Sequence, residues 1–291
     1  MTLKLADRLG RSRGRLAVLD RMSKSPPARH KPDLAHWADH ALAAAWIGHA
    51  TVLLRIGGMT ILTDPVFSSR VGVGLGLVTA GPRRLTSPAL SLRELPPIDL
   101  ILISHAHFDH LDRPTLAKMR KSIPVVTAAK TGDLITDLGF RKVRELAWND
   151  ELRLKNGVKI TALPVTHWGA RTFHDKHRGY NAYLIEAADR RILYAGDTAY
   201  HHGFKTLPPV DLAILGIGAY DPYVAAHATP EQAWLMAQHC RAARILPIHH
   251  STFRLSHEPT HEPIERLLAV AGEDVDRVVV REVGGMWAEG E

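Results

Sequence analysis

Three histidines and one aspartate are concentrated in a single hexapeptide, His105-Ala106-His107-Phe108-Asp109-His110. The hexapeptide follows the mostly apolar residues 98–103 after a single serine, a pattern that predicts a strand ending where these side chains begin. Imidazole nitrogens together with a carboxylate oxygen suit a borderline-soft divalent cation, zinc before any other. The hexapeptide therefore predicts a metal site, because packing alone does not explain it.

Three further apolar segments of the chain end in a residue that can bind a metal. These residues are His167, Asp197 and His249. A single histidine after a strand is usually a structural residue. Because the strand ends of an α/β sheet converge on one edge, however, four such endings in one chain predict that the side chains meet there.

The number of these side chains matches two metal ions. We expect His105, His107 and His167 to bind one ion, Asp109, His110 and His249 to bind a second, and Asp197 to bridge both. Each ion then keeps room for a shared water or hydroxide, which a catalytic site requires and a closed structural site lacks. Two ions about 3.5–4 Å apart lower the pKa of that water and stabilise the attacking and leaving oxygens. The expected cofactor is Zn²⁺, two per chain, with Asp109 and Asp197 in catalytic roles.

The composition of the 291-residue chain is that of a globular protein without a membrane span. The hydrophobic content of 45% and the charged content of 23% are ordinary for such a protein. No run of about 18 uninterrupted apolar residues is present, so no transmembrane helix is expected. Cys240 is the one cysteine, which excludes an intramolecular disulfide and a cysteine-ligated structural zinc and fits a reducing, cytoplasmic location.

The positive charge is concentrated at the start of the chain. Residues 1–33 hold nine Lys or Arg against three Asp, which accounts for +6 of the net charge of +7. They contain no apolar core of a signal peptide. Prolines near residue 30 predict two regions: a basic N-terminal arm over 1–40, partly helical or disordered, and a folded domain over 41–291 that carries the metal-binding residues.

Two interpretations of the basic arm remain open. In the first, the arm is solvated and makes no contact with a partner. In the second, it is a helix that lies on anionic lipid at the inner membrane face, with Leu5, Leu9, Leu16 and Leu19 in the interface.

Beyond the arm, short strands alternate with helices, which predicts an α/β layered domain. Helices are expected over 114–121 and 230–240, the second with Thr229 as N-cap, and late strands over 243–248 and 278–280. Residues 71–78 carry glycine at every second position and are predicted to be a flexible loop with exposed apolar side chains.

The order and spacing of these motifs resemble the metallo-β-lactamase fold superfamily over roughly residues 45–285. The resemblance rests on HxHxDH, the later His167, the Ala-Gly-Asp-Thr segment at 195–198 and the late His249. It implies an αββα four-layer sandwich of two mixed sheets with flanking helices, and two metals at one edge of the sheets.

Several segments resemble, more narrowly, the branch of N-acyl-phosphatidylethanolamine-hydrolysing phospholipase D. These segments are 46–51, 63–70, 95–99, 195–198, 217–222 and 249–253. Two departures are present: His250 stands where the branch usually has Trp, and Val78-Thr79-Ala80 precedes Gly81-Pro82 in place of a Gln-Tyr pair of the animal enzymes. The resemblance therefore carries over the metal site but not the lipid specificity.

The resemblance implies a binuclear zinc hydrolase, a phosphodiesterase of the phospholipase D type in lipid metabolism. Metal-bound hydroxide would attack phosphorus and release an N-acylethanolamine or a similar alcohol from a phospholipid. The alternative is a soluble metal-dependent lactonase or ester hydrolase that acts on a small, phosphorylated substrate. A nuclease is disfavoured, and no nucleic-acid partner is expected, because charge outside the arm is balanced and no aromatic stacking platform is evident. A non-enzymatic scaffold ranks last, and an oligomer remains open.

Four further residues are candidates for supporting roles, each with a structural alternative. His227 matches a family histidine near the phosphate, where it would bind a phosphoryl oxygen or protonate the leaving group, or else it only flanks a helix. Asp64 would orient the hexapeptide through hydrogen bonds or cap the turn before Pro65. His49 and Tyr220 would line the substrate pocket or belong to the core.

Overall fold

The computed structural model describes residues 25–76, 78–154 and 156–290. The first 24 residues of the basic arm, with the four leucines considered for lipid contact, lie outside this part of the chain. Within it, no helix is long and apolar enough to cross a membrane.

Two mixed β-sheets form the centre of the structure. The first has the strand order β15-β1-β2-β3-β6-β7-β8. Its strands are β1 (Leu42–Gly48), β2 (Thr51–Ile56), β3 (Met59–Thr63), β6 (Leu100–Ile103), β7 (Val125–Ala128), β8 (Val143–Leu146) and β15 (Met286–Ala288). The second has the order β14-β13-β12-β11-β10-β9. Its strands are β9 (Glu151–Arg153), β10 (Lys159–Leu163), β11 (Ala182–Ala187), β12 (Arg190–Tyr194), β13 (Leu212–Gly216) and β14 (Arg244–Ile248).

The two sheets pack face to face through one apolar face of each. Their central strands are apolar on the other face as well. In β1, Leu42, Ala44 and Trp46 belong to the core between the sheets, whereas the alternate residues Ala43 and Ala45 belong to a separate outer core. Successive side chains of a strand point to opposite faces, so a continuous apolar run is buried on both. Each sheet therefore needs a helical layer on its outer face.

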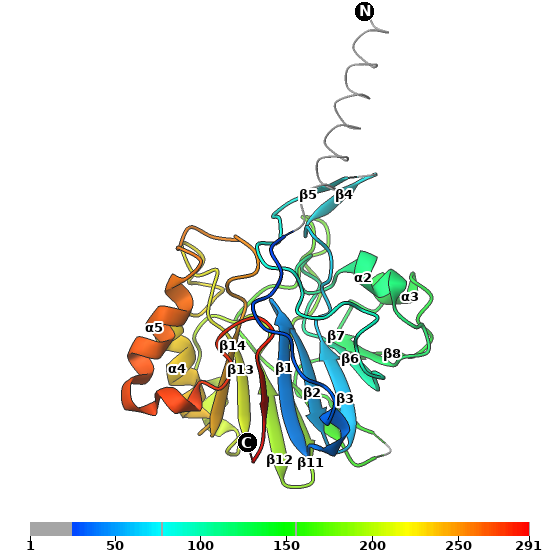
Figure 1. The fold of residues 1–291 in the computed structure, drawn as a ribbon. Coiled ribbons are helices and arrows are strands. Elements are labelled where there is room, and N and C mark those ends of the chain that lie inside the picture. The colour runs from blue at the N-terminus through cyan, green and yellow to red at the C-terminus, as the bar shows by residue number, and fades with distance from the viewer. Residues whose placement is uncertain (1–24, 77, 155, 291) are drawn as a thin grey trace, which may run out of the picture.

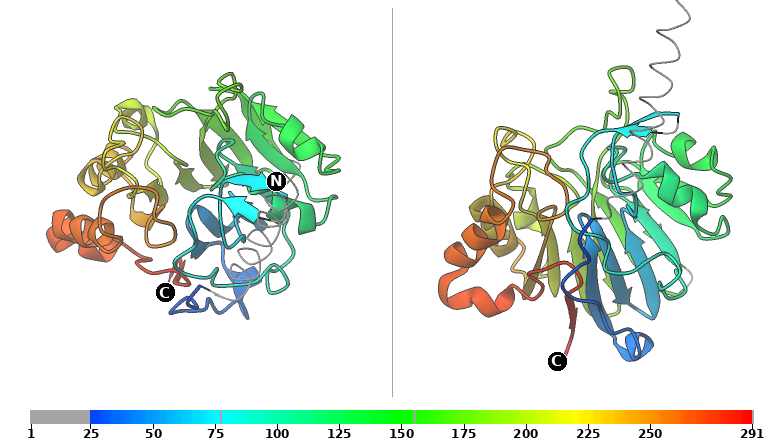
Figure 2. Two further views of the ribbon diagram at one scale, coloured as in Figure 1. Left: turned by 90° about the horizontal axis from the view of Figure 1, so that it is seen from above. Right: turned by 45° about the horizontal axis from the view of Figure 1, so that its top comes forward.

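Four short helices provide the outer layers, as Figures 1 and 2 show. They are α2 (Arg113–Lys118) and α3 (Asp133–Thr136) beside the first sheet, and α4 (Pro230–His239) and α5 (Glu262–Ala271) beside the second. Helix α4 begins as predicted: the Thr229 side chain accepts a hydrogen bond from the Gln232 backbone, and the Gln232 side chain accepts one from the Thr229 backbone. The predicted αββα sandwich is confirmed.

Strand direction brings distant residues to one edge of the sandwich. Strands β3, β6 and β7 are parallel in the first sheet, and β12, β13 and β14 are parallel in the second. Their carboxyl ends therefore lie at the same end of each sheet. This edge is where the segments with metal-binding residues begin.

The predicted flexible loop at 71–78 is wrong, because the structure has a β-hairpin there. Strands β4 (Val73–Leu75) and β5 (Val78–Ala80) pair antiparallel. Glycine makes the close pairing possible: a Cβ on Gly72 would lie 2.0 Å from the Ala80 carbonyl oxygen, and one on Gly81 would lie 2.0 Å from that of Val71. The predicted exposure of apolar side chains is confirmed for Val73 and Leu75 but is wrong for Val71, which is buried.

The late strand is also displaced from its predicted position. Val278 makes an isolated bridge to Ile245, and the residues that complete the first sheet are those of β15, which pairs with β1. The apolar run at 278–280 is not part of a strand, but Val280 packs into the core between the sheets and Val278 into the core on the outer face of the second sheet.

Residues 25–40, assigned to the arm, contact the domain. The Ser25 hydroxyl donates to the Arg84 carbonyl, and Trp37 is buried with its indole N–H donated to Thr60. The domain boundary near residue 40 stays a prediction.

Replacing Leu54 with alanine tests the core between the sheets. Leu54 is fully buried in β2, so we expect Leu54→Ala to lower the free energy of unfolding by about 2–5 kcal/mol, measured by urea denaturation. The control Leu235→Ala, on the exposed face of α4, should cost less than about 1 kcal/mol. Equal costs for the two variants would contradict this core.

Candidate metal centre

The predicted metal-binding residues meet at the carboxyl-terminal edge of the strands. His249 follows β14 directly, His105 follows β6 after Ser104, and Asp197 and His167 come shortly after β12 and β10. These residues come from both sheets, so the cluster lies where the two sheets converge. The structure thus brings together all seven residues that the sequence assigned to metal binding.

The first group contains three imidazoles and one carboxylate. The His107 Nδ1 atom lies 2.8 Å from His105 Nε2 and 3.3 Å from His167 Nε2. The Asp197 Oδ2 atom is 3.8 Å from the Nε2 atom of both His105 and His167. One ligand atom from each of the four residues falls within 4.8 Å of the others, which is compact enough for one ion.

The second group adds a residue to those predicted from the sequence. His49 joins Asp109, His110 and His249, and one ligand atom from each falls within 4.8 Å of the others. The Asp109 Oδ2 atom lies 2.9 Å from His49 Nε2, 3.3 Å from His249 Nε2 and 3.7 Å from His110 Nε2.

Asp197 lies between the two groups. Besides its distances to the first group, its Oδ2 atom is 3.1 Å from His110 Nε2 and 3.2 Å from His249 Nε2. A single carboxylate therefore faces imidazoles of both groups, which is the arrangement that a bridging ligand needs.

The chemistry of the cluster fits divalent cations. The Nε2 atoms of His110 and His249 and the Oδ1 atom of Asp197 are buried and have no hydrogen-bond partner. A buried polar atom without a partner is costly, and coordination to an ion would satisfy all three. The cluster is therefore suited to hold metal rather than to stabilise the fold by itself.

The pKa shifts of His105, His167 and Asp197 also favour metal binding. Burial lowers the pKa of His167 to about 3 and holds that of His105 well below its usual range, so both imidazoles are neutral, the form that binds metal. Burial would raise the pKa of Asp197, but His110 and His249 lower it well below its usual value. The carboxylate is thus ionised and attracts positive charge.

Asp64 lies directly behind the hexapeptide. Its Oδ2 atom is 2.6 Å from His110 Nδ1, and its Oδ1 atom accepts a hydrogen bond of 2.7 Å from the Ser104 backbone. The Tyr194 hydroxyl donates to Oδ2 over 2.6 Å. Asp64 therefore holds the Nδ1 atom of His110, so that the Nε2 atom faces Asp197. An orienting role requires contacts of this kind.

His227 lies beside the cluster on the segment before α4. Its Nδ1 atom is 3.8 Å from Asp197 Oδ2, and its ring lies near those of His167 and His249. Burial lowers the pKa of His227 to about 4, so the imidazole is neutral at pH 7. About 12% of the side chain stays exposed, which leaves it accessible to a substrate.

Tyr220 differs from the other candidates in its contacts. Its hydroxyl donates to Glu262 at the start of α5 over 2.8 Å, and the Arg266 guanidinium stacks on its ring. The structure therefore favours the alternative for Tyr220, a core residue with a satisfied polar tip.

Arg171 is a residue that the sequence analysis missed. One guanidinium nitrogen donates to the carbonyls of Ala106 and Leu111, each over 2.8 Å, and the guanidinium lies 4.0 Å from the centre of the Phe108 ring. Arg171 thus ties both ends of the hexapeptide to the segment that follows His167. Its position four residues after a predicted ligand is the only hint in the sequence.

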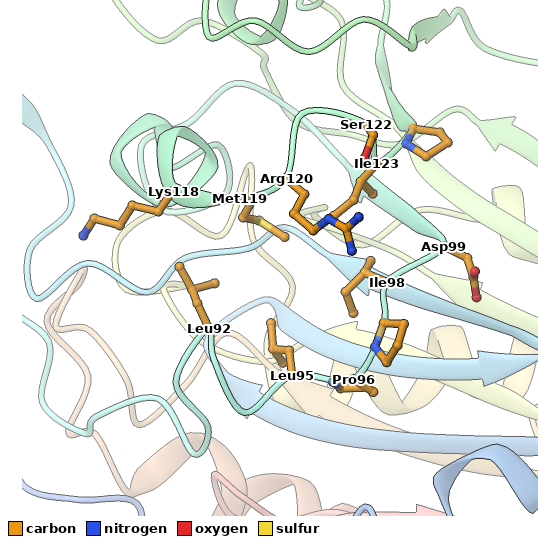
Figure 3. A pocket seen from close by; sticks show the side chains of 12 residues that line it. Leu92, Leu95, Pro96, Ile98, Asp99, Lys118, Met119, Arg120, Ser122 and Ile123 are labelled. Carbon is orange, nitrogen blue, oxygen red and sulfur yellow. The ribbon is translucent and has the colours of Figure 1, made fainter.

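A pocket elsewhere in the molecule does not include this cluster. It lies between residues 92–99, which lead into β6, and residues 118–124, which lead from α2 to β7 (Figure 3). Apolar side chains such as Leu95, Ile98 and Met119 line it. It lies at the amino ends of β6 and β7, whereas the metal-binding residues follow the carboxyl ends.

Residues 59–250 match the family model of the beta-lactamase superfamily domain. The chain is 32% identical over 276 residues to the N-acyl-phosphatidylethanolamine-hydrolyzing phospholipase D 1 of Caenorhabditis elegans, a match that covers 86% of this chain and 76% of the relative. It is 25% identical over 233 residues to a metal-dependent hydrolase of Pyrobaculum aerophilum, covering 78% and 92%.

A solved structure of similar fold is the isothiocyanate hydrolase from Delia radicum gut bacteria. The TM-score is 0.69 at 20% identity, with 84% of this chain and 98% of the other covered. At that identity the comparison supports the fold and nothing finer.

The role of Asp64 can be tested by removing its charge. We expect Asp64→Asn to weaken metal affinity about 10–100-fold, because the His110 ring loses its charged partner. The measurement is competition with a chromogenic chelator. Asp99→Asn is the control, since Asp99 accepts from the Thr60 backbone at the opposite end of the strands. Metal affinity equal to that of the control would exclude the orienting role.

Arg171→Met removes the link between the hexapeptide and the segment after His167. We expect metal affinity to fall, because the hexapeptide loses two hydrogen bonds that hold its ends. Arg190→Met, at an exposed ion pair on β12, should leave affinity unchanged. Isothermal titration of both metal-free variants checks this, and identical affinities would contradict a positioning role.

Proposed function

This chain belongs to the beta-lactamase superfamily, and we propose that it is a binuclear zinc phosphodiesterase of the phospholipase D type. The coarser statement, that it is a metal-dependent hydrolase, follows from its similarity to named hydrolases and from the histidine and aspartate cluster. The single observation that carries the finer proposal is the pair of adjoining ligand groups that share the Asp197 carboxylate.

The seven residues predicted from the sequence would hold the two ions, and the geometry adds His49 as a neighbour of the second group. When bound, two divalent ions supply a strong electrostatic field that lowers the pKa of water and neutralises charge on a phosphodiester. Zinc is the proposed metal because nitrogen ligands outnumber oxygen ligands in both groups.

The reaction is a hydrolysis at phosphorus. Water oxygen forms a new bond to phosphorus, the bond between phosphorus and the headgroup oxygen breaks, and a proton from water ends on the released alcohol. With a phospholipid the products are a phosphatidic acid and an alcohol, an N-acylethanolamine if the substrate is N-acylated. Similarity to the nematode phospholipase D at 32% identity supports this substrate class.

His227 is the residue best placed to act on the substrate. A neutral imidazole keeps one N–H that can donate a hydrogen bond to a phosphoryl oxygen, and it can deliver a proton to the leaving alcohol. Its exposed fraction and its place beside Asp197 support both roles. Asp109 and Asp197 stay ionised, so their carboxylates would attract and hold the two cations.

Removal of metal and of the central carboxylate tests the proposed centre. We expect Asp197→Ala to lose metal and to lower kcat/KM for a phosphodiester at least about 10³-fold, because both ligand groups lose their shared oxygen. Asp189→Ala, at an exposed turn, is the control with unchanged activity. Metal content by mass spectrometry accompanies the kinetics. Full activity of chelated, metal-free protein would refute the proposal.

A substrate panel on zinc-loaded protein separates the candidate functions. It compares N-acylated phosphatidylethanolamine, ordinary phospholipids, a water-soluble phosphodiester and lactones. We expect cleavage of phosphodiesters, with phospholipids preferred to the soluble diester. Turnover of lactones or soluble esters alone would favour the alternative, a soluble hydrolase of small substrates.

A further inference from the structure

Exposed apolar side chains gather around the metal centre. Ten large apolar side chains are exposed in the described part of the chain. Six of the ten lie on three segments that begin or end at residues of the centre: Val73, Leu75, Trp168, Phe173, Tyr223 and Val224. Exposed apolar groups that cluster around a site, rather than scatter singly, mark a surface that another body covers.

Each of the three segments is anchored in the metal centre. The β4–β5 hairpin lies between Asp64 at the end of β3 and the buried Arg84, the segment 168–178 starts directly after His167, and the segment 221–226 ends directly before His227. The exposed apolar side chains therefore lie on segments that start from, or lead into, the carboxyl-terminal edge that holds the centre.

The hairpin has no role in the core. No residue of β4 or β5 in the described part is buried, and Val73 and Leu75 are 50% and 65% exposed. Figures 1 and 2 show the hairpin projecting beyond the ends of both sheets. Its base is nevertheless fixed by the close approach of Gly72 and Gly81 to the opposite backbone. The chain thus holds exposed apolar side chains in a defined position, which costs solubility and indicates a function.

Basic side chains accompany the apolar ones. Lys176 is exposed on the same segment as Phe173, and Arg254 is exposed next to Phe253, which contacts His49. Apolar side chains beside exposed cations favour a surface that is apolar inside and negatively charged outside. A lipid leaflet has that chemistry.

We infer that the hairpin and the two segments at 168–178 and 221–226 form a docking face for an anionic lipid surface. Three separate segments with exposed apolar side chains fit a deformable leaflet, whereas a protein partner would need a complementary surface for each. Tryptophan and tyrosine are also the side chains that favour the membrane interface. In this orientation the metal centre faces the lipid headgroups. The inference rests on the proposed function only for the identity of the substrate.

Vesicle binding by the full chain tests this docking face. The probe is sedimentation with vesicles of phosphatidylcholine containing phosphatidylglycerol. We expect the double variant Val73→Asp/Leu75→Asp to bind about tenfold more weakly or worse than the unchanged protein, because two apolar contacts are lost. The matched control Leu235→Asp/Val270→Asp carries the same two changes on the exposed faces of α4 and α5 and should bind like the unchanged protein.

Phe173→Asp provides an independent test, since Phe173 is 92% exposed on a different segment and its replacement should leave the melting temperature unchanged. Weaker vesicle binding by this variant supports the docking face. Binding by the hairpin variant equal to that of the control, or no binding by the unchanged protein, overturns it. Self-association that the same variants abolish, without vesicle binding, would instead assign the face to a second copy of the chain.

The outcomes for docking and for the proposed function are separable. Cleavage of a water-soluble phosphodiester without vesicle binding would refute the docking face and leave the proposed function standing. Vesicle binding without cleavage of any phosphodiester would refute the proposed function and leave the docking face standing.

Discussion

The buried carboxylate of Asp197 is the constraint on which the metal centre depends. It is an ionised group, largely removed from water, that faces imidazoles from several strands. Such a charge is tolerated only when positive charge or hydrogen bonds compensate it. Asp197 in turn raises the pKa of His110 and His249, the imidazoles nearest to it. A bound cation would compensate the carboxylate and also satisfy the buried ring nitrogens that have no hydrogen-bond partner.

The two sheets are joined directly at the edge that holds the metal centre. Tyr194, at the end of β12 in the second sheet, donates to Asp64, which follows β3 in the first sheet, and so a hydrogen bond joins the two sheets directly below the metal centre. Close backbone packing supports the same place, since a Cβ on Gly196 would lie 2.7 Å from the Ser104 Cβ. The residues that support the ligands are thereby part of the core, and an error in packing would displace the ligands.

The buried strands stabilise the fold, whereas the carboxyl-terminal edge carries the candidate functional site. The central strands β1, β6 and β7 are buried along their whole length. The carboxyl-terminal edge instead collects polar atoms without partners and, beyond them, apolar side chains that no part of the fold covers. Both features are unfavourable for an isolated molecule: bound metal would satisfy the polar atoms, and the docking that we infer would cover the apolar side chains.

The sequence by itself determined the fold class, the strands that carry the metal-binding residues and the type of ligand, because apolar periodicity and HxHxDH are local patterns. It did not determine the position of His49, which meets Asp109 across 60 residues, or the link from Arg171 to the hexapeptide. The pairing of β4 with β5 and the contacts of Asp64 with His110 and Tyr194 also came only from the tertiary structure. These features depend on which distant segments are brought within hydrogen-bond distance, and no local pattern encodes that distance.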